Sequence, residues 1–379
     1  MIERTLQQKI HGMDTRGKAI MIIGPRQVGK TTMIRQELEG VDYHLFDGDD
    51  PSIRTLLDTP NTATIRRLIG DKRTVFIDEA QRITNIGLTV KIIIDQLQDV
   101  QVWLSGSSSF TLGHALNEPL TGRKWQYEMY PISWEEYQHY VGYLEAEQNL
   151  ERRLLYGFYP DVINYPNTEH ETLQNLVNSS LYSDILSYAE IRKPEVLEKL
   201  VLALALQVGN EVNYTELAAL VGVDKNTVMR YIDILEKGYV VFRLRSYSRN
   251  LRNEIKKNQK IYFYDVGVRN MIIGDFSPLA LRQDKGALWE NFLLAERRKQ
   301  NAYKRTLARP YFWRTTKGQE VDYVEERGQR VFGYEFKWSE KKQAKLPGKF
   351  LEKYKAEAAI INRQNFRDFV VLTDSMVRL

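Results

Sequence analysis

The chain has 379 residues, 43% of them hydrophobic, and a net charge of +5 from 54 Lys and Arg against 49 Asp and Glu; this length accommodates more than one domain of about 100–200 residues. The absence of cysteine excludes disulfides, thiolate nucleophiles and cysteine-ligated zinc, and the five histidines are too scattered for a local metal-ligand motif. No run reaches the ~18 apolar residues of a membrane span, and the start MIERTLQQKI is too polar for a signal peptide, so we expect a cytoplasmic protein with no membrane partner.

The first motif in the chain follows a short apolar run, AIMII, which predicts a buried strand. Gly24 and Gly29 enclose four residues and are followed by Lys30, Thr31 and a helical pattern, so the P-loop motif G-x-x-x-x-G-K-S/T is complete in its expected context. Backbone N–H groups of such a loop surround phosphates, Lys30 reaches the β and γ oxygens, and the Thr31 hydroxyl helps to hold Mg²⁺. We therefore expect ATP and Mg²⁺ to bind at Gly24, Pro25, Arg26, Gln27, Val28, Gly29, Lys30, Thr31 and Thr32.

Two further strand signals end in polar residues. The run RTVFIDEAQ ends with Asp78, which we expect to hold Mg²⁺ through water, and Glu79, which we expect to polarise the attacking water. Two adjacent acids are often only a polar turn, but beside a P-loop they reinforce the same prediction. The run VQVWLSGSSS ends in hydroxyls, so Ser105 or Ser107 is a candidate sensor of the γ-phosphate, with a simple serine-rich turn as the alternative.

The order GPRQVGKTT, FIDEAQ, LSGSSS and LTGRKWQYEMYPISWEEY resembles the AAA+ ATPases, in particular a bacterial and archaeal group in which an AAA domain is joined to a C-terminal domain of unknown function, DUF4143. The resemblance implies ATPase activity and a homo-oligomer in which an arginine of one subunit reaches the γ-phosphate of its neighbour. Arg123, in LTGR, matches the glycine–arginine pair of this group and is the first candidate for that arginine; Arg82 is the second. A surface arginine that pairs locally is the alternative for Arg123.

The middle of the chain is predicted to be helical. From Trp134 to Pro194 helices alternate with connectors, and LLYGFYPDVINYP resembles the element that opens the DUF4143 region. The segments EVLEKLVLALALQVG, YTELAALVG and DKNTVMRYIDILEKG predict three helices, and YVVFRLRS predicts a strand after them. Three helices followed by such a strand are the arrangement of a winged helix.

A winged helix of this kind suggests a DNA interface. Asp224 is a suitable N-cap for the third helix, whose first turns are then expected to face outward, where recognition helices meet bases and phosphates. Basic residues continue over the segment 243–260 and are expected to follow the phosphate backbone. The candidate DNA contacts are Lys225, Asn226, Arg230, Arg243, Arg245 and Arg249. Docking of protein partners is the alternative use of a winged helix, and a charge run is usually a solvated face.

After KIYFYDVGVRNMI, which resembles a tyrosine-x-aspartate-x-glycine signature of the DUF4143 region, the pattern changes again. GALWENFLLAERRKQ predicts a helix, YFWRT, EVDYVEE and RVFGYEFKWS predict three strands, LEKYKAEAAII predicts a helix and FVVLTD a final strand. The order αβββαβ resembles the core of the PD-(D/E)XK nuclease superfamily.

Four residues match the nuclease pattern: Glu290 in the first helix, Asp322 in the second strand, and Glu335 and Lys337 in the third. Residues two apart in a strand share a face, so Glu335 and Lys337 can converge with Asp322. Asp322 and Glu335 are expected to bind Mg²⁺ or Mn²⁺, Lys337 to position or activate water, and Glu290, in apolar company, to be paired or ligated. E-x-K is also common on solvated strands, and members of this superfamily can use the fold merely to bind.

We therefore expect an α/β protein of four domains: a P-loop AAA+ domain with a parallel sheet (1–133), a helical lid or connector (134–195), a winged helix (196–275) and a PD-(D/E)XK nuclease-like domain (276–379). ATP hydrolysis in the first domain would move the others on DNA, and metal-dependent cleavage is the further hypothesis. A nucleotide-dependent regulatory switch and a DNA clamp without nuclease activity are the two rivals.

Overall fold

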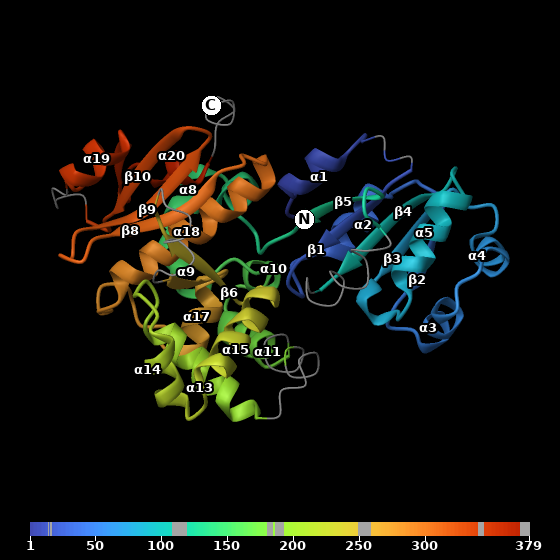
Figure 1. Cartoon of the computed structure of the whole chain (residues 1–379). Coiled ribbons are helices and arrows are strands. Elements are labelled where there is room, and N and C mark those ends of the chain that lie inside the picture. The colour runs from blue at the N-terminus through green and yellow to red at the C-terminus, as the bar shows by residue number, and fades with distance from the viewer. Residues whose placement is uncertain are drawn as a thin grey trace. The chain divides into compact units, whose positions relative to one another are not determined.

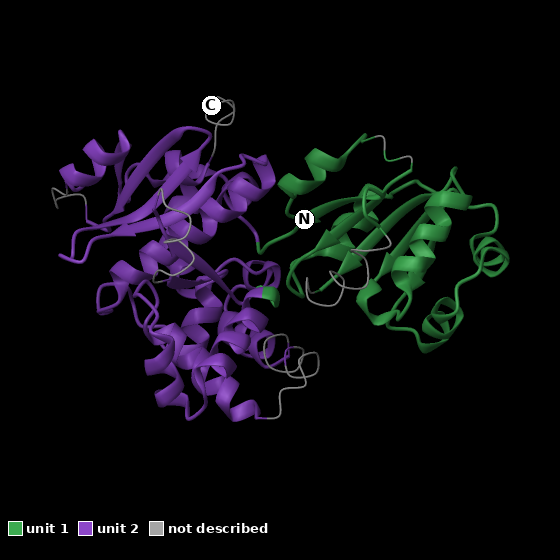
Figure 2. Ribbon diagram, in the orientation of Figure 1, with its two compact units in different colours: residues 1–131, 237–239 green, residues 132–236, 240–379 purple. Residues whose placement is uncertain are grey.

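The computed structural model describes residues 1–13, 15, 17–107, 120–179, 185, 193–248, 259–339 and 345–371. The chain divides into two compact units, and each is described by itself (Figure 2). Unit 1 comprises residues 1–131 with 237–239, and unit 2 comprises residues 132–236 with 240–379. Each unit combines helices with a sheet, which confirms the α/β fold class (Figure 1).

The described part of unit 1 is built on a parallel sheet with the order β2-β3-β4-β1-β5. Its strands are β1 (Ala19–Ile23), β2 (Tyr43–Asp47), β3 (Thr74–Asp78), β4 (Gln101–Gly106) and β5 (Lys124–Glu128). Its helices are α1 (Thr5–Ile10), α2 (Lys30–Glu37), α3 (Pro51–Asp58), α4 (Thr62–Ile69), the short 3₁₀ helix η1 (Ala80–Arg82) and α5 (Ile86–Gln96). Every residue of β1 is buried, which is why this strand appears in the sequence as an unbroken apolar run.

The strand order of unit 1 brings three loops together. β4 pairs with β1 on one side and with β3 on the other, and all these pairs are parallel. Because parallel strands end at the same edge of the sheet, the residues that follow β1, β3 and β4 emerge side by side. The P-loop, the two acids and the serines that the sequence singled out therefore belong to one edge.

Unit 2 begins with a run of helices, as predicted. They are α7 (Trp134–Val141), α8 (Tyr143–Gln148), α9 (Leu150–Tyr156), α10 (Pro160–Asn164) and α11 (Glu169–Leu176). The first of them starts at a capping box, in which Ser133 and Glu136 exchange side-chain and backbone hydrogen bonds. None of the helices in the described ranges combines the length and the apolar character that a membrane span requires.

Two glycines allow α9 to pack closely against α17 (Val266–Ile273), a helix that lies far from α9 in the sequence. A Cβ on Gly267 would collide with the carbonyl group of Tyr156, and one on Gly157 would collide with the carboxylate of Asp265. Asp265 accepts a hydrogen bond from Phe158 N at 2.7 Å and also caps the first turn of α17. The aspartate and glycine of the YFYDVG segment are therefore explained by close packing of two helix ends.

The three predicted helices of the middle region are present as α13 (Pro194–Leu206), α14 (Tyr214–Val221) and α15 (Lys225–Lys237). Gly222, in the left-handed region at φ 74°, ends α14, and Asp224 accepts hydrogen bonds from the first backbone N–H groups of α15. The strands β6 (Val241–Ser246) and β7 (Gln259–Phe263) follow as an antiparallel pair. The assignment of this region as a winged helix stays a prediction.

The described residues of unit 2 contain a mixed sheet with the order β11-β10-β9-β8-β6-β7. Its other strands are β8 (Arg309–Arg314), β9 (Glu320–Arg327), β10 (Arg330–Phe336) and β11 (Glu357–Ile361), and the helices α18 (Lys285–Lys304), α19 (Gly348–Tyr354) and α20 (Phe366–Val370) accompany them. β6 pairs in parallel with β8, so strands expected in two different domains lie in one sheet. The division into four domains stays a prediction.

The element order αβββαβ is present in α18, β8, β9, β10, α19 and β11, but the last two elements were predicted at the wrong residues. The helix expected over LEKYKAEAAII ends at Tyr354, and EAAII forms β11 instead. The segment expected as the last strand, FVVLTD, instead begins inside α20. The backbone of residues 357–361 pairs in parallel with β10, and this pairing overrides the helical preference of Ala and Glu.

A buried ion pair joins α18 to the start of unit 2. Glu296 and Lys299 are each about 1% exposed and lie 2.6 Å apart. The ammonium of Lys299 also donates to the carbonyl oxygen of Ile132 at 3.0 Å, and the backbone N–H of Trp134 donates to Glu296. Both charges therefore have partners, as burial requires.

Candidate functional site

The P-loop runs from the end of β1 to the start of α2. Gly29 has φ 91°, a left-handed conformation that favours glycine, and Lys30 begins the helix. The ammonium of Lys30, 5% exposed, donates to the carbonyl oxygens of Gly24 at 3.0 Å and Pro25 at 2.7 Å. The loop thus curls around the lysine, and these two carbonyls hold the charge that phosphate oxygens attract when a nucleotide is bound.

Two contacts with other segments of unit 1 fix the position of the P-loop. A Cβ on Gly24 would collide with the backbone carbonyl of Met129, just after β5, so glycine is required at this close approach. The guanidinium of Arg4, 4% exposed, donates to Val28 O and to Tyr130 O, each at 2.6 Å. Sequence reasoning missed Arg4, because no local pattern marks a side chain that reaches the loop from another segment.

Asp78 lies at the centre of the polar edge. Its Oδ1 accepts hydrogen bonds from the Thr31 hydroxyl at 3.0 Å, from the backbone N–H of Glu79 at 3.1 Å and from the Ser105 hydroxyl. Mg²⁺ in nucleotide sites takes one or two protein oxygens and completes its shell with phosphate and water. The hydroxyl of Thr31 and the carboxylate of Asp78 fit that requirement.

Glu79 is positioned by a residue that the sequence reasoning did not single out. Its backbone is in the left-handed region at φ 45°, and its carboxylate accepts a hydrogen bond from the side-chain amide of Gln81. The same amide nitrogen donates to the Ser107 hydroxyl at 2.8 Å. Gln81 therefore joins the candidate base to the candidate sensor serine; its place two residues after Glu79 in FIDEAQ was the available signal.

The two candidate arginines lie at different places in unit 1. Arg123 precedes β5, next to the start of β1, and therefore lies at the edge of the sheet opposite to the P-loop. Its guanidinium pairs with Asp95 at 2.7 Å. Arg82 ends η1, directly after Glu79, and pairs with Asp49 at 2.7 Å. A role in a neighbouring subunit stays a prediction for both.

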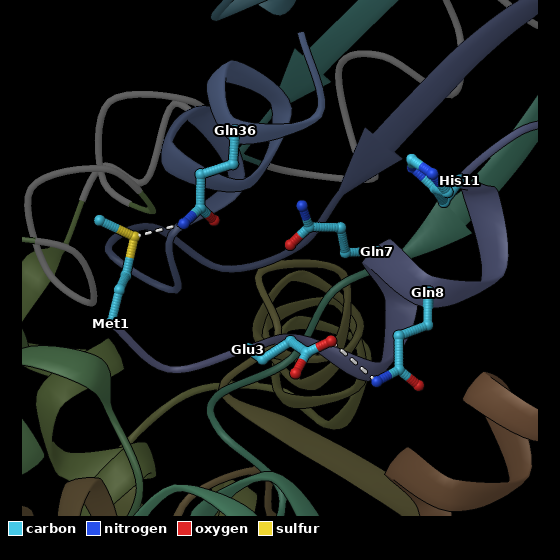
Figure 3. Close-up of a pocket in the computed structure, with 6 residues that line it drawn as sticks. All are labelled: Met1, Glu3, Gln7, Gln8, His11 and Gln36. Carbon is cyan, nitrogen blue, oxygen red and sulfur yellow. Dashed lines mark hydrogen bonds between the residues drawn. The ribbon is translucent and has the colours of Figure 1, made fainter. Parts of the chain in front are cut away.

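A pocket of unit 1 lies beside α1 and the last turn of α2 (Figure 3). Its lining comes from the polar side of α1 and from residues near it: Met1, Glu3, Gln7, Gln8, His11 and Gln36. His11 pairs with Glu37 at 2.9 Å. The lining does not include the P-loop lysine or the two acids of β3, so this pocket is separate from the polar edge described above.

In unit 2, Asp322 and Glu335 lie at the ends of neighbouring antiparallel strands. The carboxylate of Asp322 accepts a hydrogen bond from Phe336 N at 2.8 Å, and Lys337 donates to Glu335 at 2.6 Å. Burial, followed by the negative charges of Glu290 and Glu335, raises the pKa of Asp322 to about 8, although Phe336 N–H and a nearby lysine oppose the shift. These contacts bring the sequence-predicted residues of the third and second strands together.

Side chains of β7, a strand that was not predicted from the sequence, contact Glu290. The ammonium of Lys260 lies 3.3 Å from Glu290 Oε1 and 2.5 Å from Glu320 Oε1, and the Tyr262 hydroxyl also donates to Glu290 Oε1. In the described ranges, no group of three or more His, Asp or Glu is placed to hold a metal ion. Since Lys260 already supplies a positive charge to Glu290, the residues do not fit a bound divalent ion in this arrangement.

The candidate DNA contacts divide into three groups. Lys225, Asn226 and Arg230 are exposed on α15, and Arg245 is exposed on β6. The structure assigns Arg243 a different role, because its guanidinium pairs with Glu236 at 3.0 Å and with Asp233 on the side of α15. Arg249 lies outside the described residues.

Comparison with known families and proteins identifies the parts of the chain. A family model described as an AAA domain matches residues 16–138, one described as DUF8612, a domain of unknown function, matches residues 147–279, and DUF4143 matches residues 285–376. An uncharacterized protein of Mycobacterium tuberculosis is 28% identical over 329 residues, which cover 85% of this chain and 70% of that protein. An uncharacterized protein of Methanocaldococcus jannaschii is 23% identical, with coverages of 81% and 72%. Among solved structures, a Walker-type ATPase of Pyrococcus abyssi is 14% identical, with a TM-score of 0.48 and coverages of 72% of this chain and 96% of that chain.

These matches correct one expectation. LLYGFYPDVINYP and the YFYDVG segment were expected to belong to the DUF4143 region, but that match begins at residue 285 and both segments lie within the DUF8612 match. The packing of Gly157 against Asp265 explains why they belong together. The chain thus carries an AAA domain, which is an ATPase domain, and a DUF4143 region, joined by a DUF8612 region.

Proposed function

We propose that this AAA-domain protein hydrolyses ATP with Mg²⁺ at the polar edge of the sheet in unit 1. One observation carries the proposal: the Thr31 hydroxyl and the carboxylate of Asp78 are in direct contact, and the buried Lys30 directly precedes Thr31 at the end of the P-loop. These are the groups that phosphoryl transfer requires for the metal and for the β and γ phosphates.

Each residue has a distinct task in this proposal. Lys30 exchanges its two carbonyl partners for phosphate oxygens, and Thr31 with Asp78 holds Mg²⁺, which neutralises charge on the phosphates. Glu79 orients the attacking water and accepts its proton. Gln81 positions the carboxylate of Glu79 through one hydrogen bond and links it to the Ser107 hydroxyl through another.

Phosphate release and ATP binding, measured on the same preparations, test the proposal. Lys30→Ala is expected to abolish binding. Glu79→Gln is expected to bind ATP while turnover falls by about 100-fold or more, because the base is lost and the metal site is kept. Lys72→Ala, at a surface lysine that pairs with Asp42, is the matched control and should leave both measurements unchanged. Turnover that survives Lys30→Ala would overturn the proposal.

Gln81 can be tested as a positioning residue. Gln81→Leu is expected to lower kcat while the Kd for ATP stays within about twofold, since the change releases the carboxylate of Glu79 and leaves the phosphate contacts intact. Gln81→Glu should behave like the leucine variant, because a carboxylate cannot donate to Glu79. Equal loss of binding and turnover would assign Gln81 to the structure of the loop instead.

A second candidate function is DNA binding by α15 and β6. The observation that favours it is the exposed polar start of α15, with Lys225, Asn226 and Arg230, after the tight turn at Gly222. Phosphate contacts of this kind release counterions, so affinity should fall steeply as salt rises from 50 to 200 mM. Fluorescence anisotropy should show weaker duplex binding by Arg230→Glu and unchanged binding by Lys199→Glu, an exposed lysine on α13. Salt-independent binding would exclude this interface.

Assembly into a homo-oligomer completes the proposal, with an arginine of one subunit at the γ-phosphate of the next. Arg123→Ala is expected to lower the turnover of the assembled protein and not its assembly, if Arg123 is that arginine. Arg82→Ala is the parallel test. Normal turnover in both variants would remove this part of the proposal.

Cleavage of the bound DNA is a further candidate function, and it depends on the carboxylates around Asp322. Cleavage by such a site needs a divalent ion, whose place next to Glu290 is held by Lys260. We therefore favour binding without cutting, as in a clamp. Strand integrity in the presence of Mn²⁺ tests this choice, and cleavage that is lost in both Asp322→Asn and Lys337→Ala would establish the nuclease instead.

A further inference from the structure

Lys260 is a buried cation inside an acidic cluster. Its side chain is 4% exposed, and its ammonium lies 2.5 Å from Glu320 and 3.3 Å from Glu290. A buried ammonium is costly unless opposite charges and hydrogen bonds surround it. The negative charges of Glu290 and Glu320 outweigh the effect of burial and raise the pKa of Lys260, so the lysine stays charged.

Two side chains of β7 contact the same oxygen of Glu290. Tyr262, two residues further along β7, donates its hydroxyl to the same Oε1 atom. Residues two apart in a strand share a face, which is why both side chains reach the same carboxylate. A metal ion at this oxygen would have to displace both donors.

Cations already pair with the carboxylates around Asp322. Lys260 pairs with Glu290 and Glu320, and Lys337 pairs with Glu335 at 2.6 Å. A divalent ion at Glu290 would have to separate this carboxylate from Lys260 and bring two further positive charges beside the buried ammonium.

We propose that Lys260 is a built-in counter-cation that takes the place of a divalent ion at Glu290, Asp322 and Glu335, so that the cluster does not bind Mg²⁺ or Mn²⁺ while Lys260 is present. The inference refines the favoured clamp, in which this region binds and does not cut. It rests on that proposal only in assigning the region to DNA; the ion pairs of Lys260 are independent of any DNA contact.

Binding of Mn²⁺ to the nucleotide-free full chain tests the inference. Wild type and Lys260→Arg are expected to show no saturable site near the cluster in calorimetry. Lys260→Met removes the charge and keeps the length of the side chain. This variant should gain a saturable Mn²⁺ site whose affinity is at least about tenfold above any Mn²⁺ binding of the wild type. The gain should disappear in Lys260→Met/Asp322→Asn, which assigns the new site to the cluster.

Loss of Lys260 leaves Glu290 without its cation and Glu320 with Arg314 alone, so stability is measured beside binding. Mn²⁺ should raise the Tm of Lys260→Met and leave that of the wild type unchanged. Lys260→Met/Glu320→Gln also removes the negative charge of the second carboxylate that Lys260 contacts, and serves if the single variant does not fold.

Two outcomes would overturn the inference: wild-type binding of Mn²⁺ that Asp322→Asn abolishes, or a folded Lys260→Met protein that gains no site. A failure of DNA binding with the gain of Mn²⁺ binding intact would overturn the clamp and leave the inference standing.

Discussion

Asp322 carries its proton at pH values where an ordinary aspartate is ionised. Its pKa is about 8 in the folded protein, because burial and the charges of Glu290 and Glu335 disfavour the carboxylate form. In the unfolded chain it returns to about 3.9. Between these two values the folded state binds one proton more than the unfolded state. The free energy of unfolding therefore falls by about 1.4 kcal/mol for each pH unit from about pH 4 to about pH 8, and changes no further above that.

Asp322→Asn removes this titration and keeps an amide oxygen that can accept from Phe336 N. Linkage over the two pKa values gives a penalty in the wild type of about 1.5 kcal/mol at pH 5 and about 4 kcal/mol at pH 7. We expect the asparagine variant to be more stable than the wild type by these amounts, with the gap widening as pH rises to 8.

Chemical denaturation followed by tryptophan fluorescence measures the gap. Trp103 and Trp125 belong to unit 1 and the other four tryptophans to unit 2, so a Trp103→Phe/Trp125→Phe background reports on unit 2 alone. Glu352→Gln, at an exposed carboxylate of α19, is the matched control and should keep the wild-type pH profile. A constant gap between Asp322→Asn and wild type from pH 5 to pH 8 would show that Asp322 is ionised in the folded protein and refute the reasoning.

Three further changes have expected outcomes. Gly24→Ala places a Cβ against a backbone carbonyl behind the P-loop, so the Kd for ATP in calorimetry should rise at least about tenfold; an unchanged Kd would show that the loop has room. Lys299→Met leaves Glu296 buried without its cation and should lower the unfolding free energy by about 3–5 kcal/mol, whereas Glu296→Gln/Lys299→Met should recover most of the loss; additive losses would contradict the pairing. Gly267→Ala should destabilise unit 2 by more than about 2 kcal/mol in denaturant, and full stability would mean that α17 can move away from α9.

The parts of the site that sequence predicts are those with strict local spacing. The P-loop is defined by residues next to one another, so Lys30 and Thr31 were placed in the correct strand, loop and helix context. Arg4 and Gln81 were missed, and Lys260 was counted among the basic residues expected to follow the phosphate backbone although it is buried, because each acts through a contact with a segment that lies elsewhere in the chain or in the fold. Their residue types are ordinary, and only the tertiary contact distinguishes them.

The same distinction explains the errors at the C-terminal end. The strands β8, β9 and β10 follow from clear alternation and turns, and they were predicted. EAAII lacks β-branched residues in its first half and continues a helical pattern, so only its pairing with β10 makes it a strand. Arg243 was assigned to DNA from its charge alone. Its partners Asp233 and Glu236 lie in α15, the helix that precedes β6 in the chain.

The parallel pairing of β6 with β8 has a consequence for how the protein can be divided. The pair crosses the gap between the DUF8612 match, which ends at residue 279, and the DUF4143 match, which begins at residue 285. A fragment cut in that gap would present a bare strand edge on each side, and such edges invite aggregation. Expression boundaries drawn from the family matches are therefore expected to give halves prone to aggregation, so the two regions should be produced as a single piece.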